Sequence, residues 1–334
     1  MIGVGTLVTV VVTVALLPVL IRELRRRVVM DAPVERSSHE IPTPRGGGLA
    51  PAIGAAAGLL MAVGTSESTL LTVVAVAAAF GVLGFVDDVS TLSAGRRLIV
   101  QIVIAAAGVF PLVSDAADGL MPVMLAAIGW LWLVAFVNAF NFMDGINGVS
   151  ATQVAVSGIA WGLVGLWRDE TVLTSGGLIV AAAALAFLPF NVPRARVFLG
   201  DVGSYFFGGW LAALALVALG RQATLEMAVA PLLLYVCDTG VTLVKRITHG
   251  GRWREAHREH VYQRLVIGGW SHSRTTAYVG AVIALSSLLG AATMLGNLAV
   301  RVTADAALIL LMLGYLGSPT WQARRTRIVQ QRPR

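Results

Sequence analysis

The sequence is poor in charged residues and contains a single cysteine. Charged residues make up 13% of its 334 residues, whereas hydrophobic residues make up 57%. This balance excludes an ordinary soluble domain and a disordered chain, because both require a larger polar fraction. The one cysteine, Cys237, lies in an apolar stretch, which excludes a disulfide framework and a thiolate metal site. We also find no motif typical of nucleic-acid binding, so we expect no nucleic-acid partner.

Long apolar stretches recur along the chain, separated by short polar loops. About 20 apolar residues are needed to cross the hydrocarbon core as a helix, and no series of alternating ten-residue strands indicates a barrel. The sequence therefore predicts an all-α, polytopic membrane helix bundle of about 10–11 transmembrane helices. We expect one transmembrane domain over residues 1–318 and a basic cytoplasmic tail over 319–334. The predicted spans are 1–21, 47–64, 69–86, 98–114, 120–137, 149–167, 172–190, 204–220, 223–244, 276–296 and 302–318.

The basic residues are 24 arginines and Lys245, and they are unevenly distributed. The loops after odd-numbered spans, together with the tail, carry 22 of these 25 residues. The opposite connections carry only Arg168, Arg221 and Arg301. Because cytoplasmic loops are enriched in Lys and Arg, the first set is predicted to be cytoplasmic, with the amino terminus outside and the carboxyl terminus inside. The polar motifs described next would then all face the cytoplasm.

One segment, FVNAFNFMDGINGVS, is unusually rich in amide side chains and follows a long apolar run. An unbroken helix would spread residues at three-residue intervals over half its circumference, because each step falls short of a turn by roughly 60°. A helix end followed by a glycine-containing turn would let them converge on one ligand. The alternative is a polar loop that caps a membrane helix. The residues at this spacing are Asn138, Asn141, Asp144 and Asn147.

Two adjacent carboxylates, Asp87 and Asp88, end the third span in the segment GFVDD. Two acids at a membrane boundary repel each other and lose hydration, and a divalent cation would relieve both effects. Mg²⁺ typically binds one or two carboxylates together with phosphate oxygens. One acid could instead act as a general base. Solvated charges at the membrane surface are the alternative, which the helix dipole and the positive-inside rule both disfavour.

Two short glycine-containing segments carry one charged residue each. Arg45 precedes three glycines in PTPRGGG, where exposed amides and a guanidinium could contact a phosphate. A simple connecting loop is the alternative there. Asp201 lies between glycines in FLGDVGS, at the start of the eighth span. Capping of that helix is the alternative to a functional role for this carboxylate.

The last large loop contains the segment HREHVYQRL, with His257, Arg258 and His260. The two histidines lack the HExxH spacing of a zinc pair. Imidazole and guanidinium groups that contact a diphosphate are the favoured interpretation. A solvated basic loop against anionic lipid is the alternative.

Together, and in this order, these five segments resemble the polyprenyl-phosphate N-acetylhexosamine-1-phosphate transferases of glycosyltransferase family 4. The resemblance covers roughly residues 31–270. It implies a transferase that moves a HexNAc-1-phosphate from a UDP-sugar to undecaprenyl or another polyprenyl phosphate and releases UMP. It also implies a place in the bacterial inner membrane, with Mg²⁺, or Mn²⁺ in its place, as cofactor. A homodimer is a further expectation.

The same resemblance implies roles for individual residues. Asp201 matches the principal metal ligand, and Asp87 and Asp88 match an acidic pair that also serves the metal. Catalysis would involve these three aspartates and Asp144. The nucleotide sugar and its phosphates would contact Arg45, Asn138, Asn141, Asn147, Phe198, His257, Arg258 and His260.

The chain also departs from the family pattern at several positions. Asn147 stands where a second Asp is common, and Arg96 and Arg97 stand in place of lysines near the acidic pair. The last loop lacks the dense histidine cluster of the muramoyl-pentapeptide enzymes. It is more similar to the branch that uses UDP-GlcNAc and deoxy-HexNAc donors.

A transporter or flippase is the alternative function for such a chain. Transporters carry ionisable residues near the middle of their spans or have paired broken helices. Here the spans are almost free of charge except for Asp238, which lies seven residues before Lys245. We expect Asp238 to pair with another helix or to line the cleft.

Overall fold

A computed structural model of the chain describes residues 1–27, 30–31, 42–63, 67–114, 121–248 and 259–330. Nearly all of them are helical, and the only strands within these ranges, β1 and β2, are two residues long and antiparallel. The elements are α1 (Ile2–Arg26), β1 (Met30–Asp31), β2 (Thr43–Pro44), α2 (Leu49–Val63), α3 (Ser68–Ser90), α4 (Ala94–Val113), α5 (Met121–Met143), α6 (Val149–Trp167), α7 (Thr171–Asn191), α8 (Gly200–Gly220), α9 (Leu225–Val229), η1 (Ala230–Leu232), α10 (Leu233–Thr248), α11 (Val261–Ile267), α12 (His272–Ala292), η2 (Thr293–Leu295) and α13 (Leu298–Gln330).

The predicted all-α membrane bundle is confirmed. In the described ranges, ten helices are long and apolar enough to cross a membrane. The predicted span 47–64 corresponds to α2, whose 15 described residues give a length of roughly 22 Å. That length is shorter than the ~30 Å hydrocarbon core. Ten long helices and one short apolar helix agree with the prediction of 10–11 spans.

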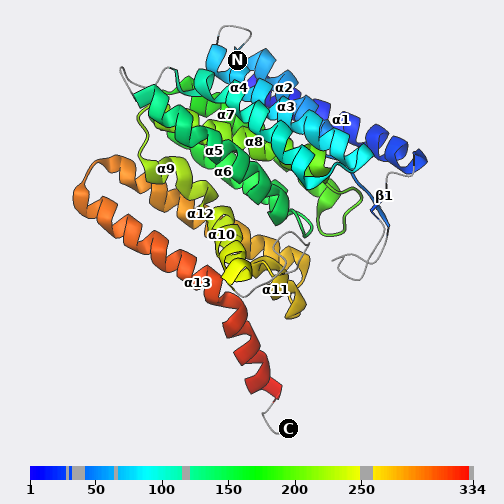
Figure 1. Cartoon of the computed structure of the whole chain (residues 1–334), viewed down its shortest axis with the longest axis vertical. Helices are drawn as coiled ribbons and strands as arrows, with labels where there is room; N and C mark the ends of the chain where they lie inside the picture. The colour runs from blue at the N-terminus through cyan, green and yellow to red at the C-terminus, as the bar shows by residue number, and fades with distance from the viewer. Residues whose placement is uncertain (28–29, 32–41, 64–66, 115–120, 249–258, 331–334) are drawn as a thin grey trace.

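The helices form two groups that lie side by side (Figure 1). Helices α1–α8 make the larger group, in which α8 is surrounded by its neighbours and is the most deeply buried span. Helices α9–α13 form the second group and contact the first through α5, α6 and α8. The carboxyl-terminal part of α13 extends beyond the other helices, and the predicted basic tail continues this helix as far as Gln330.

The predicted span 223–244 is not one continuous helix, because α9, the short 3-10 helix η1 and α10 follow one another there. Pro231 lies in η1 and has no N–H to donate. Its carbonyl oxygen accepts hydrogen bonds from Gln153 Nε2 at 2.7 Å and Ser157 Oγ at 3.0 Å, both on α6. The break in the ninth span is therefore held against α6 by buried polar side chains.

Helices α3 and α8 pack with their backbones in contact. A side chain on Gly84 of α3 would collide with the carbonyl group of Asp201 at the start of α8. This close approach brings the last turn of α3, with its two carboxylates, against the first turn of α8. The glycine thus places three of the predicted site aspartates at one end of the bundle.

Candidate active site

Arg45 joins two of these aspartates. Its Nε lies 2.9 Å from Asp88 Oδ1, and its Nη2 lies 2.6 Å from Asp201 Oδ1. The Asp88 side chain is 4% exposed and that of Asp201 is 13% exposed, whereas Arg45 is 40% exposed. One partly exposed guanidinium therefore balances two largely buried carboxylates.

Asp88 also caps helix α8. Its Oδ1 accepts the Asp201 backbone N–H at 3.0 Å, and its Oδ2 accepts that of Val202 at 3.0 Å. The preceding Gly200 has φ +75°, a left-handed conformation that glycine adopts without strain. A carboxylate at this helix end is stabilised by the otherwise unpaired amides and by the helix dipole. The capping role considered for Asp201 is thus performed by Asp88.

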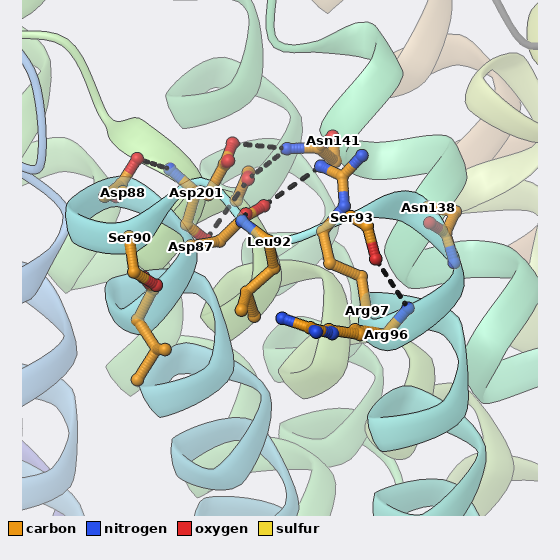
Figure 2. Close-up of polar contacts among 12 residues, drawn as sticks. Asp87, Asp88, Ser90, Leu92, Ser93, Arg96, Arg97, Asn138, Asn141 and Asp201 are labelled. Carbon is orange, nitrogen blue, oxygen red and sulfur yellow. Dashed lines mark hydrogen bonds and ion pairs between the residues drawn. The ribbon is translucent and has the colours of Figure 1, made fainter.

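Asn141 brings the end of α5 into the same cluster. Its Nδ2 donates to Asp201 Oδ1 and to Ser204 Oγ, both at 2.9 Å. Figure 2 shows Asn141 and Asp88 on either side of Asp201. In the described part of the chain, Asp201 Oδ1 accepts two donors and Oδ2 accepts none. Asp201 therefore has a carboxylate oxygen that a ligand can use.

Asp87 makes separate contacts, because consecutive side chains on a helix point in different directions. Its Oδ2 lies 2.9 Å from Arg97 Nη1, and its Oδ1 accepts the Leu92 N–H at 2.7 Å. These contacts hold the turn between α3 and α4 (Figure 2). Of the two arginines that stand in place of lysines, Arg97 thus forms an ion pair with Asp87. The backbone N–H of Arg96 donates a hydrogen bond to Ser93 Oγ.

The amides at the two ends of the NxxN segment lie away from Asp201. Asn138 exchanges hydrogen bonds with Gln101 of α4, the shorter at 2.7 Å. Asn147 Nδ2 donates to the Pro193 carbonyl at 3.2 Å, and the Asn147 carbonyl accepts Thr276 Oγ1 at 2.8 Å. Of the three asparagines, only Asn141 thus contacts the aspartate cluster within the described ranges.

Asp144 lies half-buried in the turn between α5 and α6. Burial raises the pKa of its carboxyl to about 6, and the negative charges of Asp201 and Asp88 act in the same direction. Ser150 and Arg45 oppose the rise. Because these charges influence it, Asp144 shares the electrostatic environment of the cluster. Its desolvated carboxylate would gain from a cation more than a solvated one would.

Phe198 joins the α7–α8 loop to the glycine-rich loop through its backbone. Its N–H donates to the Pro44 carbonyl and its carbonyl accepts the Gly47 N–H, both at 2.8 Å. This pairing places Arg45 beside the start of α8. The sequence could not show it, because the partners lie about 150 residues apart.

The last predicted loop is only partly described. His257 and Arg258 lie outside the described residues, so their predicted roles stay predictions. His260 is buried, and its Nδ1 lies 3.0 Å from Asp238 Oδ1. Asp238 therefore pairs with another segment, as one of its two predicted roles required.

Sequence reasoning missed several residues that support the site. Ser204 forms a hydrogen bond with Asn141, and Gln101 forms one with Asn138. The Asn191 side chain accepts the Gly148 N–H and donates to the Val197 carbonyl. Asn191 is the last residue of α7 and begins the polar stretch before FLGDVGS. That position was a signal of its role. Ser204 and Gln101 lie within apolar spans, and polar residues there often need buried partners.

These features define a multi-pass helical membrane protein with a carboxylate cluster at one end of its bundle. The model of the family "Glycosyl transferase family 4" matches residues 70–219. A probable undecaprenyl-phosphate N-acetylglucosaminyl 1-phosphate transferase of Bacillus subtilis is 30% identical over 284 residues, which cover 78% of this chain and 76% of the relative. The chain belongs to glycosyl transferase family 4.

Two further relatives carry different substrate names. A phospho-N-acetylmuramoyl-pentapeptide-transferase of Desulforudis audaxviator is 31% identical, over 86% of this chain and 96% of the relative. A decaprenyl-phosphate N-acetylglucosaminephosphotransferase of Mycolicibacterium smegmatis is 28% identical, over 74% and 71% respectively. The relatives thus share a family but differ in the sugar that their names specify.

Proposed function

We propose that this protein transfers a HexNAc-1-phosphate from a UDP-HexNAc to undecaprenyl or another polyprenyl phosphate and releases UMP. The observation that carries the proposal is the meeting of Arg45, Asp88, Asn141 and Asp201, from four separate segments, at one end of a membrane bundle. The names of the relatives support a polyprenyl-phosphate acceptor. A membrane bundle suits this reaction, because the acceptor tail lies in lipid while the donor is water-soluble.

The chemistry requires two anionic phosphates to meet. An oxygen of the acceptor phosphate attacks the sugar-bearing phosphorus in line, and the bond from that phosphorus to UMP breaks, so that UMP leaves with the electron pair. Catalysis of such an exchange depends on positioning and on neutralising negative charge. Arg45 offers a half-exposed guanidinium for a phosphate, and Asn141 fixes the Asp201 carboxylate. Asp144 adds a second carboxylate nearby.

The residues present fit a divalent cation that is completed by substrate. Within the described ranges, no three His, Cys, Asp or Glu side chains group closely enough to hold a metal by themselves. Mg²⁺ commonly uses one or two carboxylates, with phosphates and waters completing its coordination. Asp201 has an available oxygen, whereas both oxygens of Asp87 and Asp88 accept hydrogen bonds, which favours Asp201 as the ligand. When bound, Mg²⁺ would supply positive charge to the reacting phosphates.

A turnover assay tests the proposed function. Purified protein in lipid, given UDP-GlcNAc, undecaprenyl phosphate and Mg²⁺, is expected to release UMP and form a lipid diphosphate sugar; omission of the acceptor is the control. Other UDP-HexNAc donors follow if UDP-GlcNAc is inactive. Turnover of a UDP-hexose without the acetamido group, and of no UDP-HexNAc, would contradict the sugar assignment. Lipid movement without any transfer would favour the transporter alternative.

Membrane sidedness gives a separate prediction. In a Cys237→Ala background, single cysteines at Gly95 and Arg194 are expected to resist an impermeant reagent added to intact cells, because both are predicted to be cytoplasmic. A cysteine at Asn297, in the connection between α12 and α13, is expected to react. All three positions are exposed. External labelling at Gly95 or Arg194 would reverse the predicted orientation.

The raised pKa of Asp144 predicts a pH dependence. Since the carboxyl loses its charge as the pH falls through about 6, kcat/KM is expected to fall there, approaching tenfold per pH unit below it. Asp144→Asn should show low activity and a shallower fall with pH, the remaining dependence belonging to the other carboxylates of the cluster. A raised pKa also means that the folded chain holds the proton more tightly than the unfolded chain. This stabilising contribution is lost as the pH rises through about 6, so Asp144→Asn should unfold at a higher temperature than wild type at pH 8. A pH dependence of unchanged steepness in the variant would show that Asp144 makes no contribution to it.

A further inference from the structure

Asp238 is a buried carboxylate that joins three helices. It lies on α10 and is fully buried. Its Oδ1 lies 3.0 Å from His260 Nδ1, and its Oδ2 accepts the Tyr315 hydroxyl of α13 at 2.8 Å. The Val261 N–H, the first of α11, is shared between both oxygens at 3.2 and 3.0 Å. The carboxylate thus has several donors, as a buried charge requires.

Helix α11 depends on such contacts because it contains only seven residues. A helix of that length is unstable without tertiary contacts. Asp238 binds its first N–H, and Gln322 of α13 binds its other end. Gln322 Nε2 donates to the Leu265 carbonyl at 3.1 Å and to the Gly268 carbonyl at 2.8 Å. Both ends of α11 are therefore held by side chains from α10 and α13.

The side of α11 that faces α5 touches the Asp144 turn. The hydroxyl of buried Tyr262 donates to the Phe142 carbonyl at 3.2 Å, two residues before Asp144. Gly145 follows Asp144 in this turn, and a side chain at Gly145 would collide with the Tyr262 hydroxyl. Tyr262 therefore lies directly against the backbone that carries Asp144.

We propose that Asp238 and Tyr315 are positioning residues for the Asp144 turn and act on it through α11. The Tyr315 hydroxyl donates to the Asp238 carboxylate, and that carboxylate accepts the first N–H of α11. On the same helix, the Tyr262 hydroxyl donates to the Phe142 carbonyl, next to the Asp144 turn. Within the described ranges, the side-chain hydrogen bonds of Tyr315 and Asp238 lie outside the Arg45 cluster. Helix α13 thereby gains a role in the site without contributing a residue that contacts substrate.

Hydrogen exchange tests the proposal without any assumption about the reaction. Tyr315→Phe removes the hydroxyl that bonds Asp238 but keeps the ring stacked on Tyr278. The backbone amides of residues 145–148 are expected to exchange about tenfold faster in this variant. That change corresponds to ~1.4 kcal/mol, near the value of a hydrogen bond to a charged group. Tyr278→Phe is the matched control, because it alters the same aromatic stack and leaves Asp238 fully bonded.

Activity supplies a second readout, which rests on the proposed function. Asp238→Asn and Tyr315→Phe are each expected to lower kcat by about tenfold with little change in the donor KM, because a displaced catalytic group slows chemistry more than binding. The double variant should lose less than the product of the two single effects, since both act through one contact network.

Several outcomes would overturn the proposal. One is unchanged exchange at residues 145–148 in Tyr315→Phe. Another is faster exchange confined to α11, and a third is a uniform increase over the whole chain that Tyr278→Phe reproduces. If the protein transferred no sugar phosphate at all, the proposed function would fail while the exchange result would still decide this inference.

Discussion

Asp201→Asn is expected to lower turnover by at least ~100-fold while the protein folds and inserts normally. The asparagine carbonyl can still accept the hydrogen bonds that Arg45 and Asn141 donate to Oδ1. What the variant loses is formal charge and the second carboxylate oxygen, to which no described residue donates a hydrogen bond. Since the proposed Mg²⁺ site depends on that charge, the variant should also need more Mg²⁺ for half-maximal turnover. Steady-state kinetics over a Mg²⁺ titration measures both effects.

Asp88→Asn is the variant to compare with Asp201→Asn, because Asp88 caps helix α8. Its side-chain NH₂ would face one of the two α8 amides that now donate to the carboxylate. Loss of a helix cap costs ~0.5–2 kcal/mol, so this variant should unfold at a lower temperature, whereas Asp201→Asn should not. Near-normal turnover of Asp201→Asn at an unchanged Mg²⁺ requirement would remove Asp201 from the metal site. The ion would then have to be held by Asp87, Asp88 or Asp144.

The contrast between these two aspartates shows where sequence reasoning ends. A carboxylate in the first turn of a helix is an ordinary candidate for its cap, and Asp201 occupies such a position. The cap instead comes from Asp88, which lies 113 residues earlier. Periodicity and local spacing carry no information about a donor and acceptor that only the packing of α3 on α8 brings together.

The bundle itself was predictable because its signals are local. Long apolar runs predict spans directly, although the predicted span 120–137 stops short of the end of α5, which continues to Met143 before the turn. The predicted turn is also present, with Gly148 at φ +81°. The three-residue spacing suggested that all four polar side chains could converge. Asn138 and Asn147 instead bond Gln101 and Pro193, whose positions depend on helix packing that the spacing does not encode.

The pairing of the last loop shows the same limit. From the sequence, Asp238 was predicted either to pair with another helix or to line the cleft, and His257 and His260 were predicted to contact a diphosphate. The structure places His260 on Asp238, over 22 residues of separation. A buried acid needs a partner, so the existence of one was foreseeable, whereas its identity depends on the fold of α11.

Arg45→Gln is expected to reduce both stability and turnover, and added Mg²⁺ should restore much of the stability. In the wild-type protein one guanidinium contacts Asp88 and Asp201. Its removal leaves two largely buried carboxylates close together without a balancing charge. An unsatisfied buried polar group costs about 1–3 kcal/mol, and a charged one costs more. We expect a loss of about 2 kcal/mol, because half-exposed Arg45 leaves room for water to replace it in part.

The Mg²⁺ response separates this variant from a simple loss of packing. A ligand that binds only the folded state stabilises it by RT ln(1 + [L]/Kd), or about 2.7 kcal/mol at a hundredfold excess over Kd. A space vacated between two carboxylates should bind Mg²⁺ more tightly than the same place in the wild-type protein, where the guanidinium would repel the ion. The unfolding temperature of Arg45→Gln should therefore rise more steeply with Mg²⁺ than that of wild type. Arg97→Gln is the matched control, because it removes a similarly exposed arginine from one buried carboxylate, Asp87. Equal Mg²⁺ responses in all three proteins would show that no cation enters between Asp88 and Asp201.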